Sequence, residues 1–319
     1  TEFPTPTPTE LMPQNPLETP TATPTTNLTP TALTFTPTIT VTPTPTEAPL
    51  IGTYALFEQL TLSDGTSLEG IEIIGPPHPP SGFETERASV DIAGGLSAQG
   101  LRTLSVPAYR WVFGCSAVSG AMIAGYYDNN GFPNMYTGPS NGGVMPMVDG
   151  MWSTWSDGSD TYPNNPLIAS KNGVDGRTSR GSIDDYWVRY GSTESDPFIT
   201  NGWAQHSFGT AIGDYMHTSQ STYENSDGST RFYNYSSGSS PLSCDYMASA
   251  GLPDGSLGRR SFYQARGYTV SECYNQKTDN QVSGGFSFAQ YKAEIDSSHP
   301  VMLNLTGHTV VGVGYDDSS

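Results

Sequence analysis

The sequence contains few positively charged residues: 13 lysines and arginines stand against 31 aspartates and glutamates, for a formal net charge of −18. Proteins that bind nucleic acids carry basic patches, and anionic lipid surfaces attract basic segments, so this charge argues against both kinds of partner. No apolar run is long enough to cross a bilayer, and no signal peptide is visible at the start of the chain. We therefore expect no nucleic-acid partner and no membrane span.

Several motifs of known chemistry are also missing from the sequence. There is no zincin motif, P-loop or serine-elbow motif, and the short Gly312–Gly314 segment is not a dinucleotide fingerprint. His206 and His217 have no partner at metal-ligand spacing. The Asp- and Asn-rich loops of residues 129–180 lack the spaced carboxylates of an EF-hand, which makes calcium there the weaker alternative. We expect neither a metal nor a cofactor.

Cysteine is scarce, and its three positions are Cys115, Cys244 and Cys273. An odd number of cysteines in a secreted protein leaves one thiol that is reactive or pairs with another molecule. The simplest pairing joins Cys244 to Cys273, since both lie in turn-rich surroundings, and leaves Cys115 free. Three reduced thiols are the alternative.

Threonine and proline dominate residues 1–48, and the first basic residue is Arg87. Such a tract cannot bury a core, stays extended and is often O-glycosylated. We predict a disordered stalk or linker that holds the remainder away from a cell surface, or else an uninformative tail. Residues 49–100 follow, with a short β-hairpin that turns at Asp64-Gly65 and a proline-rich connector, which we interpret as a possible pro-segment or an outer layer. Residues 101–319 are predicted to form the main domain, cut short at its C-terminus.

Local patterns in the main domain indicate both helices and strands. Helices are expected to start near Ser182 and to lie near residues 210–219, 257–265 and 288–296; strands are expected at 268–273, 301–306 and 307–315. Ser287 and Gln290 match a capping box at the start of the last helix. The mixture predicts an α+β fold class.

The stretch Val106–Asp128 is the most informative part of the chain. Apolar residues at three- and four-residue steps after Cys115 predict a helix, with Ser116 as its cap. A thiol at a helix N-terminus lies in a positive field, which lowers its pKa and favours the nucleophilic thiolate. A buried, inert cysteine is the alternative, because free cysteines are among the most buried residues.

His308 opens the second informative segment, a glycine-rich and nearly continuous apolar strand. A side chain at the very start of a strand can face a cleft. A cysteine at a helix head and a distant histidine on a strand form the layout of papain-like cysteine peptidases. His299, next to Pro300, is the minor alternative for the histidine.

Two motifs resemble a papain-like group that includes the bacteriocin leader (double-glycine) peptidases. Gly114–Asp128, GCSAVSGAMIAGYYD, resembles the nucleophile helix of that group, and His299–Asp316, HPVMLNLTGHTVVGVGYD, resembles its histidine strand. The resemblance implies a central helix that bears Cys115 and packs on an antiparallel sheet. It also implies Cys115 as nucleophile and His308 as base, acting as a thiolate–imidazolium pair.

The chain departs from that group at two positions. The group usually has a glutamine about six residues before the cysteine as oxyanion donor, whereas this chain has Tyr109 and Arg110 there as candidate donors. The residue that orients the histidine normally follows on the next strand. Asp316 and Asp317 come too soon for that role, so we expect the orienting residue beyond Ser319.

These observations support three hypotheses about function. The first is a secreted or surface-tethered cysteine peptidase that hydrolyses peptide or protein substrates, with an extracellular or cell-surface location. The second is a non-catalytic module on a Thr/Pro stalk that binds an extracellular polymer through its many Tyr and Trp residues. The third is a papain-like amidase or acyltransferase.

Overall fold

A computed structural model describes the protein, whose chain divides into Thr1–Thr40 and Val41–Ser319. The described residues all belong to the second unit and comprise 54–75, 100–110, 114–136, 143–152, 154–156, 161–163, 165–168, 211–218, 220, 223–225 and 228–317. The predicted stalk, the predicted helix at Ser182 and His206 lie outside them. Within these residues, no helix has the length and apolar character that crossing a membrane requires.

Helices and small antiparallel sheets make up the described residues, which confirms the α+β class. The strands are β1 (Ala55–Thr61), β2 (Ser67–Ile73), β3 (Leu101–Thr103), β4 (Thr154–Ser156), β5 (Thr161–Pro163), β6 (Thr230–Tyr235), β7 (Leu242–Ser243), β8 (Tyr274–Asn275), β9 (Val301–Leu305), β10 (His308–Gly312) and β11 (Gly314–Asp316). The helices are α2 (Cys115–Asn129), α4 (Ile212–Tyr215), α5 (Cys244–Ser249), α6 (Gly255–Ala265) and α7 (Phe288–Asp296).

Local sequence signals account for several of these boundaries. Helix α7 begins with the predicted capping box, in which Ser287 Oγ accepts from the Gln290 N–H and Gln290 Oε1 accepts from the Ser287 N–H. The hairpin turns at Asp64-Gly65, where Gly65 adopts a φ of 86°. The strand expected at residues 268–273 is wrong, because that segment is irregular and β8 starts only at Tyr274.

The β1–β2 hairpin belongs to the same sheet as β6, in the order β1-β2-β6. A buried ion pair joins β2 to β6, since Arg231 Nη2 on β6 lies 3.5 Å from Glu72 Oε2 on β2. The other oxygen of this carboxylate, Glu72 Oε1, accepts from Ser229 Oγ at 2.6 Å. Leu68 and Ile73 of the hairpin are fully buried. The hairpin, which precedes the predicted boundary at residue 101, therefore supplies core residues.

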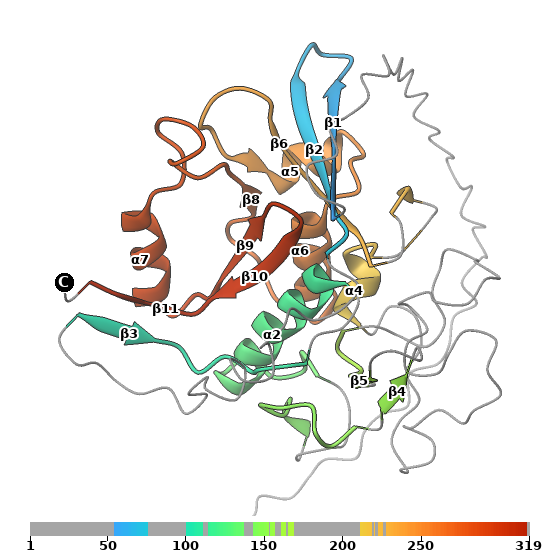
Figure 1. Cartoon of the computed structure of the whole chain (residues 1–319), viewed down its shortest axis with the longest axis vertical. Helices are drawn as coiled ribbons and strands as arrows, with labels where there is room; N and C mark the ends of the chain where they lie inside the picture. Colours follow the sequence, from blue (N-terminus) through green and yellow to red (C-terminus); the bar gives the residue numbers. More distant parts are fainter. Residues whose placement is uncertain are drawn as a thin grey trace, which may run out of the picture. The chain divides into compact units, whose positions relative to one another are not determined.

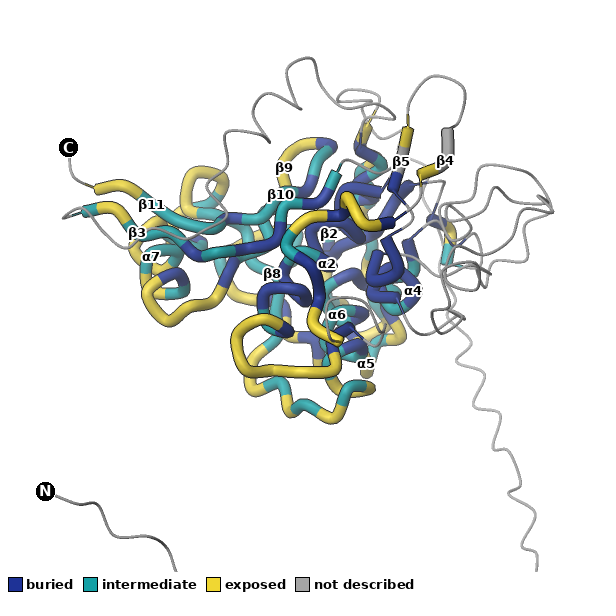
Figure 2. Tube along the Cα trace, turned by 90° about the horizontal axis from the view of Figure 1, so that it is seen from below, coloured by how far each residue is buried: buried dark blue, intermediate teal, exposed yellow. Residues whose placement is uncertain are grey.

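Helix α2 is buried on nearly all sides, with 12 of its 15 residues buried. It packs against β10 and α4, as Figure 1 shows, and it runs through the mostly buried part of the chain in Figure 2. A helix enclosed in this way carries apolar and small residues around its whole circumference rather than on one face. At Gly120, a Cβ would lie 2.9 Å from Met216 Sδ, so a small residue is needed there. The Cys115 helix is thus the centre of the largest apolar cluster.

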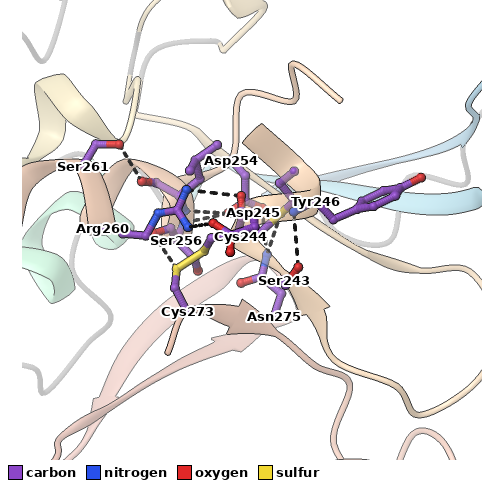
Figure 3. The surroundings of a disulfide bond; sticks show 12 residues. Ser243, Cys244, Asp245, Tyr246, Asp254, Ser256, Arg260, Ser261, Cys273 and Asn275 are labelled. Carbon is purple, nitrogen blue, oxygen red and sulfur yellow. Dashed lines mark hydrogen bonds and ion pairs between the residues drawn. A yellow bond between two sulfur atoms is a disulfide. The ribbon is translucent and has the colours of Figure 1, made fainter. Parts of the chain in front are cut away.

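A disulfide joins Cys244, at the start of α5, to Cys273, just before β8 (Figure 3). The same two residues share a backbone hydrogen bond, since the Cys244 N–H donates to the Cys273 carbonyl at 2.8 Å. The pairing predicted from the cysteine count is confirmed, and Cys115 is a free, buried cysteine.

Candidate functional site

Cys115 is the first residue of α2, as the sequence predicts. The residue before it, Gly114, is the N-cap and adopts the left-handed conformation, with a φ of 117°, which glycine accepts at no steric cost. No side chain caps this helix end, so the prediction that Ser116 is the cap is wrong. The Ser116 hydroxyl instead pairs with Thr309 Oγ1 on β10 at 2.7 Å.

Strand β10 contacts the head of α2 through its own backbone. The Thr309 N–H donates to Cys115 Sγ at 3.3 Å, and the Thr309 carbonyl accepts from Ser119 Oγ at 3.1 Å. On its other side β10 pairs antiparallel with β9, where Thr309 lies opposite Asn304. The side chains of α2 therefore satisfy the edge of a two-stranded antiparallel sheet, directly at the cysteine.

His308 is the first residue of β10 and is half-buried. It immediately precedes the residue whose N–H binds Cys115 Sγ, so the two segments that carry the predicted nucleophile and base lie together. Burial lowers the pKa of His308 below its usual value. A neutral imidazole is therefore favoured, which is the form that can accept a proton.

The electrostatics of Cys115 differ from the sequence-based expectation. Burial raises the pKa of the Cys115 thiol, although the neighbouring Thr309 and Ser116, above all the Thr309 N–H, oppose that rise. The positive field of a helix N-terminus was expected to lower it, but loss of solvent outweighs that field here. Burial thus favours the neutral form of both the Cys115 thiol and the His308 imidazole in the conformation described.

Gly75, at the end of the β1–β2 hairpin, lies against the sulfur. A Cβ placed on Gly75 would lie 3.0 Å from Cys115 Sγ, and the Cys115 side chain is only 3% exposed. Gly75 is held by its N–H, which donates with that of Ile74 to the Tyr54 carbonyl. Tyr54 in turn lies against Gly307, the residue before His308, where a Cβ would lie 2.8 Å from Tyr54 Cβ. We call Tyr54, Ile74 and Gly75 the hairpin cover.

The two oxyanion candidates occupy different environments. The Tyr109 hydroxyl is buried, donates to the Pro146 carbonyl at 3.0 Å and lies beside Gly125. Gly125 is ten residues along α2 from Cys115, or about 15 Å at 1.5 Å per residue, which is too far for Tyr109 to bind an oxyanion at the sulfur. Burial also raises the pKa of Tyr109 well above its usual value. The assignment of Tyr109 is therefore wrong. Arg110 is partly buried and its N–H donates to Asp149 Oδ2 at 2.5 Å, and its assignment as oxyanion donor stays a prediction.

The other described histidines lie away from Cys115. His299 is exposed and its Nδ1 pairs with Glu294 Oε2 of α7 at 2.9 Å. His217 stacks on Tyr223, with ring centroids 3.7 Å apart, and burial lowers its pKa to about 4. Among residues that the structure describes, no group of three or more His, Cys, Asp or Glu side chains is placed to hold a metal ion.

Sequence reasoning missed two parts of this site, the hairpin cover and the Thr309 contacts. The signal available for the cover was Gly75 itself, a glycine before a proline pair at the end of a predicted strand. Nothing local connects that glycine with a cysteine 40 positions later. Thr309 carried a weaker signal, since it is a polar residue at the start of an apolar strand.

No family model, no curated protein and no solved structure matches this chain. Around Cys115 the structure places a buried thiol, the strand that begins at His308, and Gly75 against the sulfur.

Proposed function

We propose that the chain is a cysteine peptidase in which Cys115 is the nucleophile and His308 the general base. The observation that carries the proposal is the hydrogen bond from the Thr309 N–H to Cys115 Sγ, which holds the histidine strand against the helix head. A cysteine-bearing helix packed on an antiparallel pair of strands is the arrangement that the papain-like resemblance implies. We extend the proposal to a papain-like fold and to a secreted or surface-tethered location on the Thr/Pro stalk.

The reaction follows from the two side chains. His308 removes the thiol proton as Cys115 Sγ attacks the substrate carbonyl carbon, and the carbonyl oxygen becomes an oxyanion that the Cys115 N–H and Arg110 are proposed to bind. The imidazolium then gives its proton to the leaving amine, and the C–N bond breaks. Water, deprotonated by His308, attacks the thioester and releases the carboxylic acid and the free thiol.

The described conformation is a closed form of the proposed enzyme. A substrate carbonyl must come within bonding distance of Cys115 Sγ, yet Gly75 lies against that sulfur and only 3% of the side chain is exposed. Catalysis therefore requires the hairpin cover to move away from the sulfur.

The burial of Cys115 is also the observation that favours the competing function, a non-catalytic binding module with an inert cysteine. The two differ in whether His308 influences the thiol. In an enzyme, the histidine promotes deprotonation of Cys115, whereas an inert buried thiol reacts at a rate that is independent of His308.

Alkylation of Cys115 separates these functions. We expect iodoacetamide to modify Cys115 of the full chain at neutral pH, and the rate to fall about tenfold or more in His308→Ala, because the base is lost. The measurement is the time course of adduct formation at Cys115 by mass spectrometry. His299→Ala is the matched control and should react like the unchanged protein. Equal alkylation rates in the unchanged protein, His308→Ala and His299→Ala would contradict the peptidase proposal.

Once His308 is shown to act on Cys115, the substrate class decides between a peptidase and an amidase or acyltransferase. We expect hydrolysis of peptides without any requirement for a second acyl acceptor. Turnover of simple amides or acyl donors, without cleavage of peptides, would favour the third hypothesis instead.

The hairpin cover makes a further prediction about access. Gly75→Ala places a side chain in a left-handed conformation, with a φ of 75°, and within 3.0 Å of Cys115 Sγ. The backbone cost alone is about 1–2 kcal/mol, so we expect the covered state to lose population and Cys115 to alkylate about tenfold faster.

Gly65→Ala is the matched control for that experiment. Gly65 also has a left-handed φ, 86°, but no atom lies within 4 Å of the position of its Cβ, at the opposite end of the hairpin. Both variants should lower the stability of the hairpin, and only Gly75→Ala should increase alkylation. The same acceleration in both would show that the contact at Gly75 does not control access.

A further inference from the structure

Thr309 makes more polar contacts around Cys115 than any role in strand pairing requires. Its N–H binds Cys115 Sγ, its carbonyl accepts from Ser119 Oγ, and its hydroxyl contacts both Ser116 Oγ and Asn304 Oδ1. Thr309 is 2% exposed, and Ser116 and Ser119 are buried equally completely. Four hydrogen bonds therefore fix one buried residue between the helix head and the neighbouring strand.

The direction of the hydroxyl contacts follows from counting protons. A threonine hydroxyl has one proton to donate. The Thr309 hydroxyl donates it to Asn304 Oδ1 at 2.9 Å, so in the 2.7 Å contact the Ser116 hydroxyl must be the donor and Thr309 Oγ1 the acceptor. The result is a directed chain, from Ser116 through Thr309 to the exposed Asn304.

This chain holds the Thr309 N–H in place. The hydroxyl of Thr309 is already used by Asn304, so its side chain anchors the residue while the backbone N–H points at the sulfur. A backbone donor aimed at a thiol sulfur stabilises the thiolate over the thiol, since hydrogen bonds to a charged group favour its charged form. The N–H of this same residue is among the groups that oppose the effect of burial on Cys115.

We infer that Thr309 is a positioning residue, which fixes its backbone N–H on Cys115 Sγ and thereby favours the thiolate as His308 takes the proton. The inference rests on the proposed function for its catalytic meaning, although the contact itself does not. Ser116 and Asn304 hold the Thr309 hydroxyl from either side. The ionisable group next to the contact is His308, and the groups that bind Thr309 from α2 and β9 are otherwise neutral.

The test is the pH dependence of Cys115 alkylation in the full-length protein. Thr309→Val keeps the shape of the side chain and removes the hydroxyl. We expect the rate at neutral pH to fall about fivefold, which corresponds to the loss of one net hydrogen bond. We also expect the alkaline limb of the profile to move to higher pH. Thr309→Ser restores the hydroxyl and should restore the profile.

Thr218→Val is the matched control, because Thr218 is 1% exposed and its hydroxyl also forms a 2.7 Å pair, with Thr230, away from the sulfur. It should lower the thermal midpoint about as much as Thr309→Val does and leave the alkylation profile unchanged. If Thr309→Val fails to fold, Ser116→Ala removes the donor of the same chain and should move the profile in the same direction. Profiles that coincide with that of the unchanged protein, or an equal movement in Thr218→Val, would overturn the inference.

The outcome is separable from that of the proposed function. If the pH profile of alkylation moves in Thr309→Val but does not change in His308→Ala, the effect of Thr309 on the Cys115 thiol is supported and the peptidase proposal is rejected. A rate that depends on His308 but not on Thr309 would do the reverse.

Discussion

Replacing Cys115 with serine is expected to reduce peptide hydrolysis by about a thousandfold or more, to the level of the background reaction. A serine hydroxyl is a far weaker nucleophile than a thiol unless its whole environment is built to activate it. The serine hydroxyl can accept the hydrogen bond from the Thr309 N–H in place of the sulfur, so the N-terminus of α2 should keep its position. The measurement is the release of cleaved products from a peptide mixture, followed by mass spectrometry.

His308→Ala is the second half of this prediction, and its loss should be as severe because the two residues act as one unit. The acid limb of the pH–rate profile is expected below the usual pKa of histidine, since burial lowers the pKa of His308. His299→Ala provides the control, and the thermal midpoints of all variants show that the fold persists. Hydrolysis that survives in Cys115→Ser would disprove the assignment of the nucleophile. Running the series also in Gly75→Ala separates loss of chemistry from lack of access.

The largest expected effect on stability is at Asp254, the N-cap of α6. Its Oδ1 accepts from the N–H groups of Ser256 and Leu257, which caps the helix, and its Oδ2 accepts from the Tyr233 N–H on β6 and from Asn275 Nδ2 on β8. One carboxylate, 1% exposed, therefore joins a helix to two strands beside the disulfide (Figure 3).

Asp254→Asn can keep the two capping bonds but turns an amide NH₂ towards two donors, the buried Tyr233 N–H and the partly buried Asn275 Nδ2. We expect a loss of about 3 kcal/mol in the free energy of unfolding, because those donors lose their acceptor in a site without solvent. The measurement is urea unfolding followed by circular dichroism. Ser243→Ala is the control: it removes only an exposed cap of α5 and should cost about 1 kcal/mol. Equal losses in both variants would show that the bonds to the strands contribute nothing.

The pH dependence of this effect has a defined sign. Burial raises the pKa of Asp254 to about 6, against the lowering effect of its four hydrogen bonds. The folded protein therefore binds this proton more tightly than the unfolded chain does, so the stability that Asp254 contributes falls as the pH rises from about 4 to 6. The difference in stability between the unchanged protein and Asp254→Asn should accordingly be larger at pH 4 than at pH 7. A difference that grows with pH would contradict the raised pKa.

In the proposed enzyme, the way in which the hairpin cover moves determines how a substrate reaches Cys115. The cover is built from the ends of a hairpin, and the buried Glu72–Arg231 pair ties β2 to β6 three residues before Gly75. The hairpin as a whole is thus not free to leave, whereas Gly75 at its end is held by the backbone of Tyr54. Exposure of Cys115 is expected to require a local change at that end, without unfolding of the β1-β2-β6 sheet.

The sequence determined those features whose causes lie within a few residues of each other. Ser287 and Gln290 specify the start of α7 because each side chain reaches the backbone N–H of the other three positions away. Asp64-Gly65 specifies a hairpin turn because glycine accepts a positive φ. The helix at Cys115 was predicted from apolar residues at three- and four-residue steps, and the strand at His308 from a nearly continuous apolar run. The odd cysteine count, together with the turn-rich surroundings of Cys244 and Cys273, indicated the disulfide.

Tertiary structure alone decided what surrounds the sulfur. Gly75, Cys115 and Thr309 meet across gaps of 40 and 194 positions, and no local pattern encodes such contacts. The pKa of Cys115 shows the reason most clearly: its place at a helix N-terminus predicts a lowered value, but burial, which depends on long-range packing, raises it. Tyr109 failed as an oxyanion donor for the same reason: it is six residues before Cys115 in the sequence, yet its hydroxyl lies beside Gly125, near the other end of α2. Local sequence patterns were sufficient to predict the helix that begins at Cys115 and the strand that begins at His308. Packing between distant segments determined the pKa of Cys115 and its exposure to solvent.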